Sequence, residues 1–161
     1  MPQRITDLSS FNAAHDAGLR KLLPGVPRIA IGMGTCGMGN GAEAVYHAFA
    51  DAIHNLGLGF HLTRTGCFGY CAAEPLVNVQ LPGLPLVVLR RIQASDVPAL
   101  LDELAAGRIP AELALCKVEE WDHITATIKY GTGLPEIPHW HEVPFFKGQK
   151  KIVLRNCGLI S

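Results

Sequence analysis

Residues 28–49 read RIAIGMGTCGMGNGAEAVYHAF, a short apolar run followed by a glycine-rich loop and a helical pattern. The apolar residues 29–31 predict a strand, and the glycines that follow predict a loop around Cys36. Apolar residues then recur at helical spacing over roughly residues 41–56 and stop at Gly57. This stretch therefore predicts one strand and one amphipathic helix, with a cysteine-bearing loop between them.

The change from strand to cysteine-bearing loop occurs again in residues 60–83, which read FHLTRTGCFGYCAAEPLVNVQLPG. Residues 60–63 alternate between apolar and polar side chains, which predicts a second strand. The loop after this strand contains Cys67 and Cys71. Alternation over residues 77–81 predicts a third strand.

A hairpin and a helix complete the pattern. Residues 82–83 (Pro-Gly) predict a turn, and residues 86–89 predict the strand that runs back from it. The apolar spacing after Ser95 predicts a last helix that closes at Gly107. The order β-α-β-β-β-α predicts an α/β fold with the thioredoxin-like architecture over residues 27–107.

The β-α-β unit determines where the cysteines are expected to lie. It favours a parallel strand pair with a right-handed crossover. Loops that follow the carboxyl ends of parallel strands lie at the same end of a sheet, so the Cys36 loop is expected beside the loop of Cys67 and Cys71. One helix is expected to cover each face of the sheet.

The segments on either side of this domain are predicted to be simpler. Residues 1–26 predict an N-terminal helical lead-in. Residues 108–161 are rich in proline, contain the cluster His139-Trp140-His141 and show no pattern of a second core. We expect them to form an extended C-terminal arm that wraps a partner.

The composition restricts the broad class of protein. The chain has 161 residues, of which 48% are hydrophobic and 17% are charged, so one domain with a real core is expected. The net charge is +0 and no cluster of Lys and Arg occurs, which argues against nucleic acid as a partner. The apolar runs are too short for a transmembrane segment, and polar residues near the N-terminus argue against a signal peptide. We therefore expect a cytoplasmic protein.

The placement of the cysteines indicates metal chemistry. The chain has five cysteines, an odd count that disfavours a disulfide framework. Cys36, Cys67 and Cys71 lie in glycine-bearing loops, whereas cysteines kept for packing usually lie in apolar runs. Three converging thiols favour a soft metal, and first of all a [2Fe–2S] cluster, whose ligands are usually four thiolates. Zinc and thiol chemistry stay open as alternatives.

A resemblance to a known family is carried by GTCGMGNGAEAVYHAF (34–49), TRTGCFGYCAAEPLVNVQLPG (63–83) and VPALLDELAAG (97–107). These stretches resemble the thioredoxin-like [2Fe–2S] ferredoxin domain, which occurs as the small subunit of NADH dehydrogenases. The domain also occurs fused to the N-terminus of the NADH-binding flavoprotein subunit of bacterial NADH dehydrogenase, NAD-linked hydrogenase and formate dehydrogenase complexes. This fused form is the more similar, because PFFKGQKKIVLRNCGLIS (144–161) looks like the lead-in to a flavin-binding core.

The resemblance implies an electron-transfer module. It implies a one-electron relay at a [2Fe–2S] cluster held by Cys36, Cys67 and Cys71, with other subunits of a multi-subunit redox complex as partners. FMN, NAD and a [4Fe–4S] cluster would belong to a core beyond this sequence, so we expect a fragment that does not oxidise NADH by itself. The alternative is a cluster-free docking or assembly module of the same kind of complex. A weaker alternative is a thiol oxidoreductase that uses Cys67 and Cys71.

The family pattern has one ligand more than this chain. Four-cysteine members carry a further cysteine a few residues before the position matched by Cys36, where this chain has Ile31, Gly32 and Met33. Cys116 lies in an apolar run and is expected to be a buried free thiol, and Cys157 is expected to pack in the missing core. The candidates for a fourth donor are His47, His61, Cys116 and a solvent molecule.

Overall fold

The computed structural model describes residues 4–123, 126–153 and 155–160. Within these residues, five strands form the main sheet in the order β2-β1-β3-β4-β5, and a separate hairpin pairs β6 with β7. β1 and β2 are parallel, whereas the other neighbours are antiparallel. The strands are β1 (Arg28–Gly32), β2 (His61–Thr65), β3 (Val77–Gln80), β4 (Leu86–Leu89), β5 (Ala114–Val118), β6 (Glu120–His123) and β7 (Ala126–Lys129).

The helices occur where the periodicity predicts them, with one addition. The cysteine-bearing loop after β1 contains a short helix, α2, so Cys36 lies in a helical turn. The predicted α/β fold is confirmed. The α-helices are α1 (Leu8–Leu22), α2 (Thr35–Gly39), α3 (Ala42–Leu56) and α4 (Val97–Ala105). Short 3₁₀ helices occur at Cys71–Ala73, Ala94–Asp96, Ala111–Leu113 and Trp140–Glu142.

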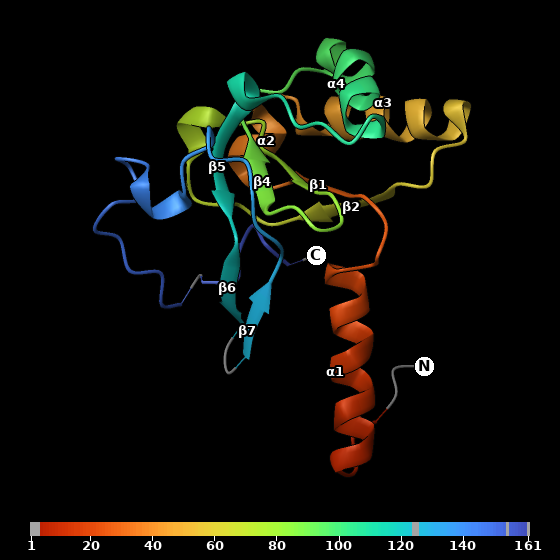
Figure 1. Cartoon of the computed structure of the whole chain (residues 1–161), viewed down its shortest axis with the longest axis vertical. Coiled ribbons are helices and arrows are strands. Elements are labelled where there is room, and N and C mark those ends of the chain that lie inside the picture. The colour runs from red at the N-terminus through yellow and green to blue at the C-terminus, as the bar shows by residue number, and fades with distance from the viewer. Residues whose placement is uncertain (1–3, 124–125, 154, 161) are drawn as a thin grey trace.

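One face of the sheet is covered by α3 and α4, which lie together (Figure 1). Ile29 and Ile31 of β1 are fully buried on this face, together with Phe49 of α3 and Leu101 of α4. Burying a side chain of this size stabilises the fold by about 1.5–3 kcal/mol. The expectation of one helix on each face is wrong, because the apolar stripe of α4 packs against α3 as well as the sheet.

The opposite face of the sheet is covered largely by C-terminal residues. Leu86 and Val88 of β4 belong to a second apolar cluster that also contains Trp121, Phe146 and Leu159. The expectation that residues 108–161 add no core is therefore corrected. β5 extends the sheet, and the chain after it folds back across the domain (Figure 1).

Two buried amides attach these C-terminal residues to β3. The Asn78 side chain donates a hydrogen bond to the carbonyl of Gly158. The Gln80 side chain donates to the carbonyls of Leu84 at 2.6 Å and Tyr130 at 3.5 Å. A buried amide left without partners costs about 1–3 kcal/mol, so these bonds help to select the observed path of the chain.

The predicted N-terminal helix is confirmed as α1, which extends away from the sheet (Figure 1). Asp7 caps its N-terminus, where the Asp7 carboxylate accepts the Ser10 backbone N–H at 2.7 Å. Leu22, near its C-terminal end, packs against the second apolar cluster, whereas Leu8 and Phe11 are 72% and 52% exposed. Among the described residues, no helix is both long and apolar enough to cross a membrane.

Candidate metal centre

Cys36 lies in the first turn of α2, directly after β1. The helix lies so close to the strand that a Cβ atom at Gly37 would collide with the carbonyl oxygen of Gly32. At the start of the same helix, a Cβ atom at Gly34 would lie 2.8 Å from the Cβ of Cys67. Glycine at these positions therefore allows the two cysteine loops to meet.

We expect Gly34→Ala to push the two loops apart. The added Cβ would contact Cys67 at a distance that real Cβ atoms essentially never show. The loop must shift, which should lower the free energy of unfolding by about 1–3 kcal/mol in urea titrations. Gly39→Ala is the matched control, because a Cβ at Gly39 of the same helix meets nothing within 4 Å. Equal costs for the two variants would contradict this account.

The three thiols converge at this point. The Cys71 thiol interacts electrostatically with the thiols of both Cys36 and Cys67. The interaction with Cys36 is the main reason why the pKa of Cys71 is raised. Cys71 is exposed, and the other two are partly buried. The structure thus brings together the three cysteines selected from the sequence.

The Cys67 thiol is held by its own loop. Burial is the main cause that raises its pKa, and the Gly69 N–H, which donates to its Sγ at 3.2 Å, opposes this rise. Reactive cysteines of thiol oxidoreductases have lowered pKa values, so the raised pKa values of Cys67 and Cys71 disfavour that alternative. Metal binding requires thiolates and would release these protons.

The sequence analysis did not select Glu74, which lies beside the thiols. Glu74 is buried, with only 6% of its surface exposed. One oxygen, Oε2, accepts the Leu76 backbone N–H at 2.7 Å, and Oε1 has no hydrogen-bond partner among the described residues. Its charge contributes to the raised pKa values of Cys67 and Cys71, after burial and the contacts between the thiols. An acidic residue inside the apolar stretch CAAEPLV is the signal that the sequence offered.

The pH dependence of the metal-free protein should reveal this carboxylate. Burial raises the pKa of Glu74 above its usual 4.5, although the Leu76 N–H opposes the rise. The native carboxyl therefore holds its proton more tightly than the unfolded chain does, and stability falls as the pH rises through these two pKa values. Each unit of difference costs about 1.4 kcal/mol.

Glu74→Gln should remove this fall in stability. The free energy of unfolding of the variant, measured relative to the wild type in urea, should rise between about pH 4 and about pH 8. The two thiols that feel the charge of Glu74, Cys67 and Cys71, have pKa values raised above 9.0 and keep their protons over this range. A difference that stays constant over this range would contradict the buried, unpartnered carboxylate.

The residues that the sequence suggested as a fourth ligand do not lie in the two cysteine loops. His61 begins β2, roughly 13 Å along the strand from Thr65, at its other end. His47 is exposed on α3, where its ring meets Tyr46. Cys116 is fully buried in β5, and this burial raises its pKa to about 12, so it is the free thiol that was expected.

The described residues contain no group of three or more His, Cys, Asp or Glu side chains placed to hold a single metal ion. The thiol of Cys71 interacts with those of Cys36 and Cys67, but the three are not placed as a metal-binding group in the part of the chain that the structure describes.

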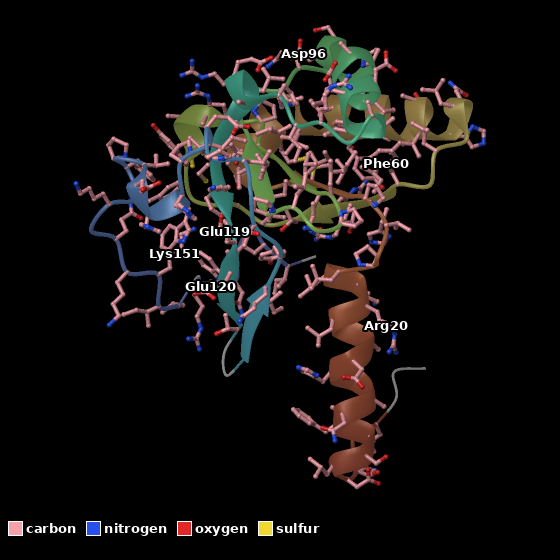
Figure 2. All side chains as sticks on the ribbon, viewed as in Figure 1. Arg20, Phe60, Asp96, Glu119, Glu120 and Lys151 are labelled. Atoms are coloured by element: carbon pink, nitrogen blue, oxygen red, sulfur yellow. The ribbon has the colours of Figure 1, made fainter. Side chains whose placement is uncertain are left out.

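The C-terminal residues border the Cys67 loop. Lys151, shown beside the hairpin in Figure 2, donates from Nζ to the Phe68 carbonyl at 2.7 Å. The same ammonium lies 3.9 Å from the centre of the Phe68 ring, a cation–π contact. Cys157 is partly buried and lines a cavity of about 450 Å³ with Gly66. The loop that carries Cys67 is thus packed against residues far along the chain.

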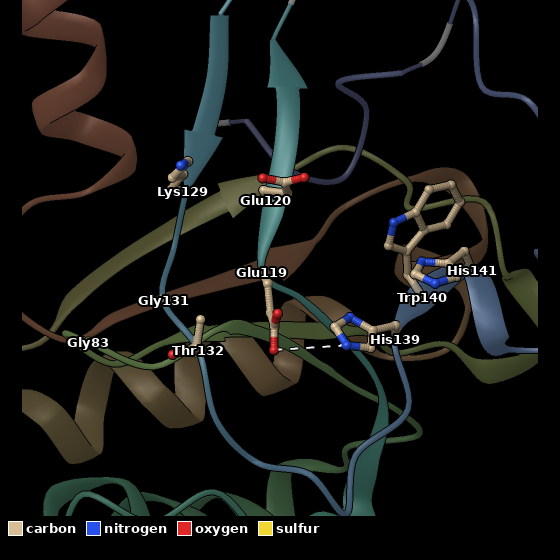
Figure 3. A pocket seen from close by; sticks show the side chains of 9 residues that line it. All are labelled: Gly83, Glu119, Glu120, Lys129, Gly131, Thr132, His139, Trp140 and His141. Carbon is tan, nitrogen blue, oxygen red and sulfur yellow. Dashed lines mark ion pairs between the residues drawn. The ribbon is translucent and has the colours of Figure 1, made fainter.

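A separate cavity lies at the hairpin, and the cysteines do not line it (Figure 3). Its volume is about 610 Å³. Glu119 forms an ion pair with Lys117 at 3.3 Å and a longer one with His139 at 3.9 Å. The rings of His139 and His141 stack 5.3 Å apart. These contacts favour packing over metal binding for the two histidines.

Comparisons with known proteins agree with the fold. The thioredoxin-like [2Fe–2S] ferredoxin from Aquifex aeolicus is similar over 57% of this chain and 98% of its own, at 21% identity and a TM-score of 0.50. A cysteine-to-serine variant of that ferredoxin is similar over 56% of this chain and 99% of its own, at 20% identity and a TM-score of 0.50. The chain therefore has the fold of the thioredoxin-like [2Fe–2S] ferredoxins.

A relative by sequence is the NADP-reducing hydrogenase subunit HndB of Solidesulfovibrio fructosivorans. It is 29% identical over 85 residues, which are 52% of this chain and 68% of HndB. No protein-family model matches the chain. The expected fold is confirmed, and the expected fusion to a flavoprotein subunit stays a prediction.

Proposed function

We propose that this chain is an electron-transfer module whose [2Fe–2S] cluster is held by Cys36, Cys67 and Cys71. The observation that carries the proposal is that the two cysteine loops, which follow the parallel strands β1 and β2, meet where Gly34 faces Cys67. When bound, such a cluster supplies reversible one-electron exchange. The protein supplies the ligands and backbone donors such as the Gly69 N–H, which tune the sulfur atoms.

The names of the similar proteins support this proposal. One is a ferredoxin with a [2Fe–2S] cluster, and the other is a subunit of an NADP-reducing hydrogenase. The proposed setting is therefore a multi-subunit redox complex. The finer proposal is the N-terminal module of an NADH-oxidising flavoprotein subunit, with FMN, NAD and a [4Fe–4S] cluster in a core outside this sequence. The segment 144–161, which resembles the lead-in to such a core, supports it.

Iron and sulfide analysis tests the cluster. Protein purified and reconstituted without oxygen should contain two irons and two acid-labile sulfides per chain, as the cluster formula requires. It should be coloured, and it should give an EPR signal after reduction by one electron. Colourless protein without stoichiometric iron would exclude the electron-transfer role. The finer proposal is tested by purification from native cells, where a flavin-free preparation would count against it.

A cluster-free docking module is the second candidate, and the exposed half of α1 favours it. Leu8 and Phe11 leave apolar surface on a helix that extends from the domain. Replacing both with serine should weaken co-purification with the native partner subunits, since the apolar contact is lost. Unchanged assembly, together with an iron-loaded wild-type protein, would leave the electron-transfer role as the better description.

A further inference from the structure

The N-terminal half of α1 presents apolar side chains that the described part of the chain leaves uncovered. The structure describes every residue of this helix, and none of them is buried. Leu8 and Phe11 are both largely exposed. They lie three residues apart, so they project from the same face of the helix. An exposed apolar face of this kind marks a surface that another protein covers.

The C-terminal half of the same helix borders a hollow of about 260 Å³, which lies between α1 and β7 (Figure 1). A Cβ atom at Gly18 would meet nothing within 4 Å, so the helix surface is open at this point. The side chains that line the hollow are mainly apolar. From α1 they are His15, Leu19 and Leu22, beside Gly18, and from β7 and the C-terminal segment they include Ile128 and Ile160.

The spacing of these residues lets two copies of the helix complete each other. Two antiparallel helices can be set with Phe11 of one copy opposite Gly18 of the other. A two-fold axis then passes between Ala14 and His15, so the same contact is made twice. Leu8 of each copy lies opposite the turn that contains Leu22 of the other. The exposed apolar side chains of each copy thus meet the hollow of the other.

Charged residues favour the antiparallel orientation. Asp7 and Lys21 are both exposed and lie two heptads apart, so they flank the apolar face on the same side. Antiparallel pairing places Asp7 of one copy beside Lys21 of the other, and the two-fold axis repeats this pair. Parallel pairing would place like charges side by side, which disfavours that orientation. The helix dipoles also attract each other when the helices are antiparallel.

We propose that α1 forms the interface of a two-fold symmetric dimer of this chain. In this dimer, Leu8 and Phe11 of each copy fill the hollow beside Gly18 of the other copy. One helix carries both the protruding side chains and the hollow that they fit, with charges that match across the axis. A subunit of different sequence would not require this self-complementarity, so a second copy is the occupant. The inference does not depend on the cysteine site.

Sedimentation equilibrium of the full chain measures the association. The wild type should be a dimer, and Phe11→Ser should raise its dissociation constant by about tenfold or more, as expected for a central aromatic anchor. Gly18→Leu should have the same effect because it fills the hollow. Its monomer should stay folded by circular dichroism, since leucine favours a helix more than glycine does. Ala13→Leu is the matched control, because position 13 lies on the opposite face of α1.

Lys21→Glu tests the orientation of the two helices. It would place two acidic side chains beside each other twice across the axis, so it should weaken the dimer most at low salt, where charges are least screened. Association that is equal to that of the wild type at low salt would overturn the antiparallel arrangement.

The remaining outcomes are distinct. A wild type that stays monomeric at every concentration overturns the inference and assigns the apolar half of α1 to a different subunit. A dimer that is unchanged in Phe11→Ser and Gly18→Leu, or equally weakened in Ala13→Leu, also overturns it. A dimer weakened in the first two variants alone supports it. Iron and sulfide content decide the proposed function separately, so an iron-loaded monomer contradicts only the dimer and an iron-free dimer contradicts only the proposed function.

Discussion

Phe146→Ala should lower the free energy of unfolding by about 3–5 kcal/mol, the range for truncating a buried aromatic side chain. Phe146 is 1% exposed. Its ring centre lies 5.3 Å from that of Phe68 and 5.7 Å from that of Tyr70. Urea titration measures the loss. Since Phe68 and Tyr70 belong to the Cys67–Cys71 loop, iron uptake should fall in the same variant.

Phe145 provides a matched control for this prediction. It is the same residue type one position earlier, but it is 43% exposed, and its ring stacks on Tyr70 at 4.3 Å. Phe145→Ala should cost about 1 kcal/mol, the value of an aromatic pair with little burial. Similar losses for the two variants would mean that the second apolar cluster does not hold the loop.

Cys67→Ser should abolish most of the visible absorption and iron content of the reconstituted protein. A serine hydroxyl keeps its proton near neutral pH, whereas iron–sulfur clusters are held by thiolates. Replacing residues outside the ligand sphere typically lowers metal affinity by roughly tenfold to hundredfold. The loss of metal affinity in Cys67→Ser should be larger. Iron analysis and absorption spectroscopy of protein handled without oxygen measure it.

Cys157→Ser is the control for this change. Cys157 is partly buried like Cys67 and undergoes the same exchange of sulfur for oxygen, but it lies in the C-terminal segment. It should keep its iron and colour. Equal losses in the two variants would indicate a general effect of cysteine replacement and would count against the three-thiol site.

The sequence predicts the elements whose signals are local. Apolar residues at helical spacing predict α3, and the adjacent apolar run predicts β1, because both patterns are complete within a few turns or residues. The convergence of Cys36 with the Cys67 loop also follows from the order β-α-β, since parallel strands end at the same side of a sheet.

The C-terminal packing could not be read from local patterns. Asn78 and Gln80 alternate with apolar residues, which is typical of a strand with one polar face. Their partners, Gly158 and Tyr130, lie 80 and 50 residues away in sequence. Prolines interrupt the periodicity of this region, and no spacing rule links such distant polar groups.

Glu74 escaped the sequence analysis for a similar reason. Its place beside Gly32 and Gly37 depends on how β1, α2 and the second loop meet in three dimensions. The letters Glu-Pro after Cys71 predict only a turn. The burial of its carboxylate and the missing partner of Oε1 become visible only once the elements are assembled.

Through Lys151, the C-terminal segment can affect the electrostatics of the thiol site. Its ammonium group is fixed over the ring of Phe68, the neighbour of Cys67, and also lies within charge range of the Cys67 thiol. In the proposed electron-transfer role, a cation held at this place would favour the addition of negative charge at the thiol site. A residue 84 positions beyond Cys67 would thereby help to set the driving force for charge exchange with a partner.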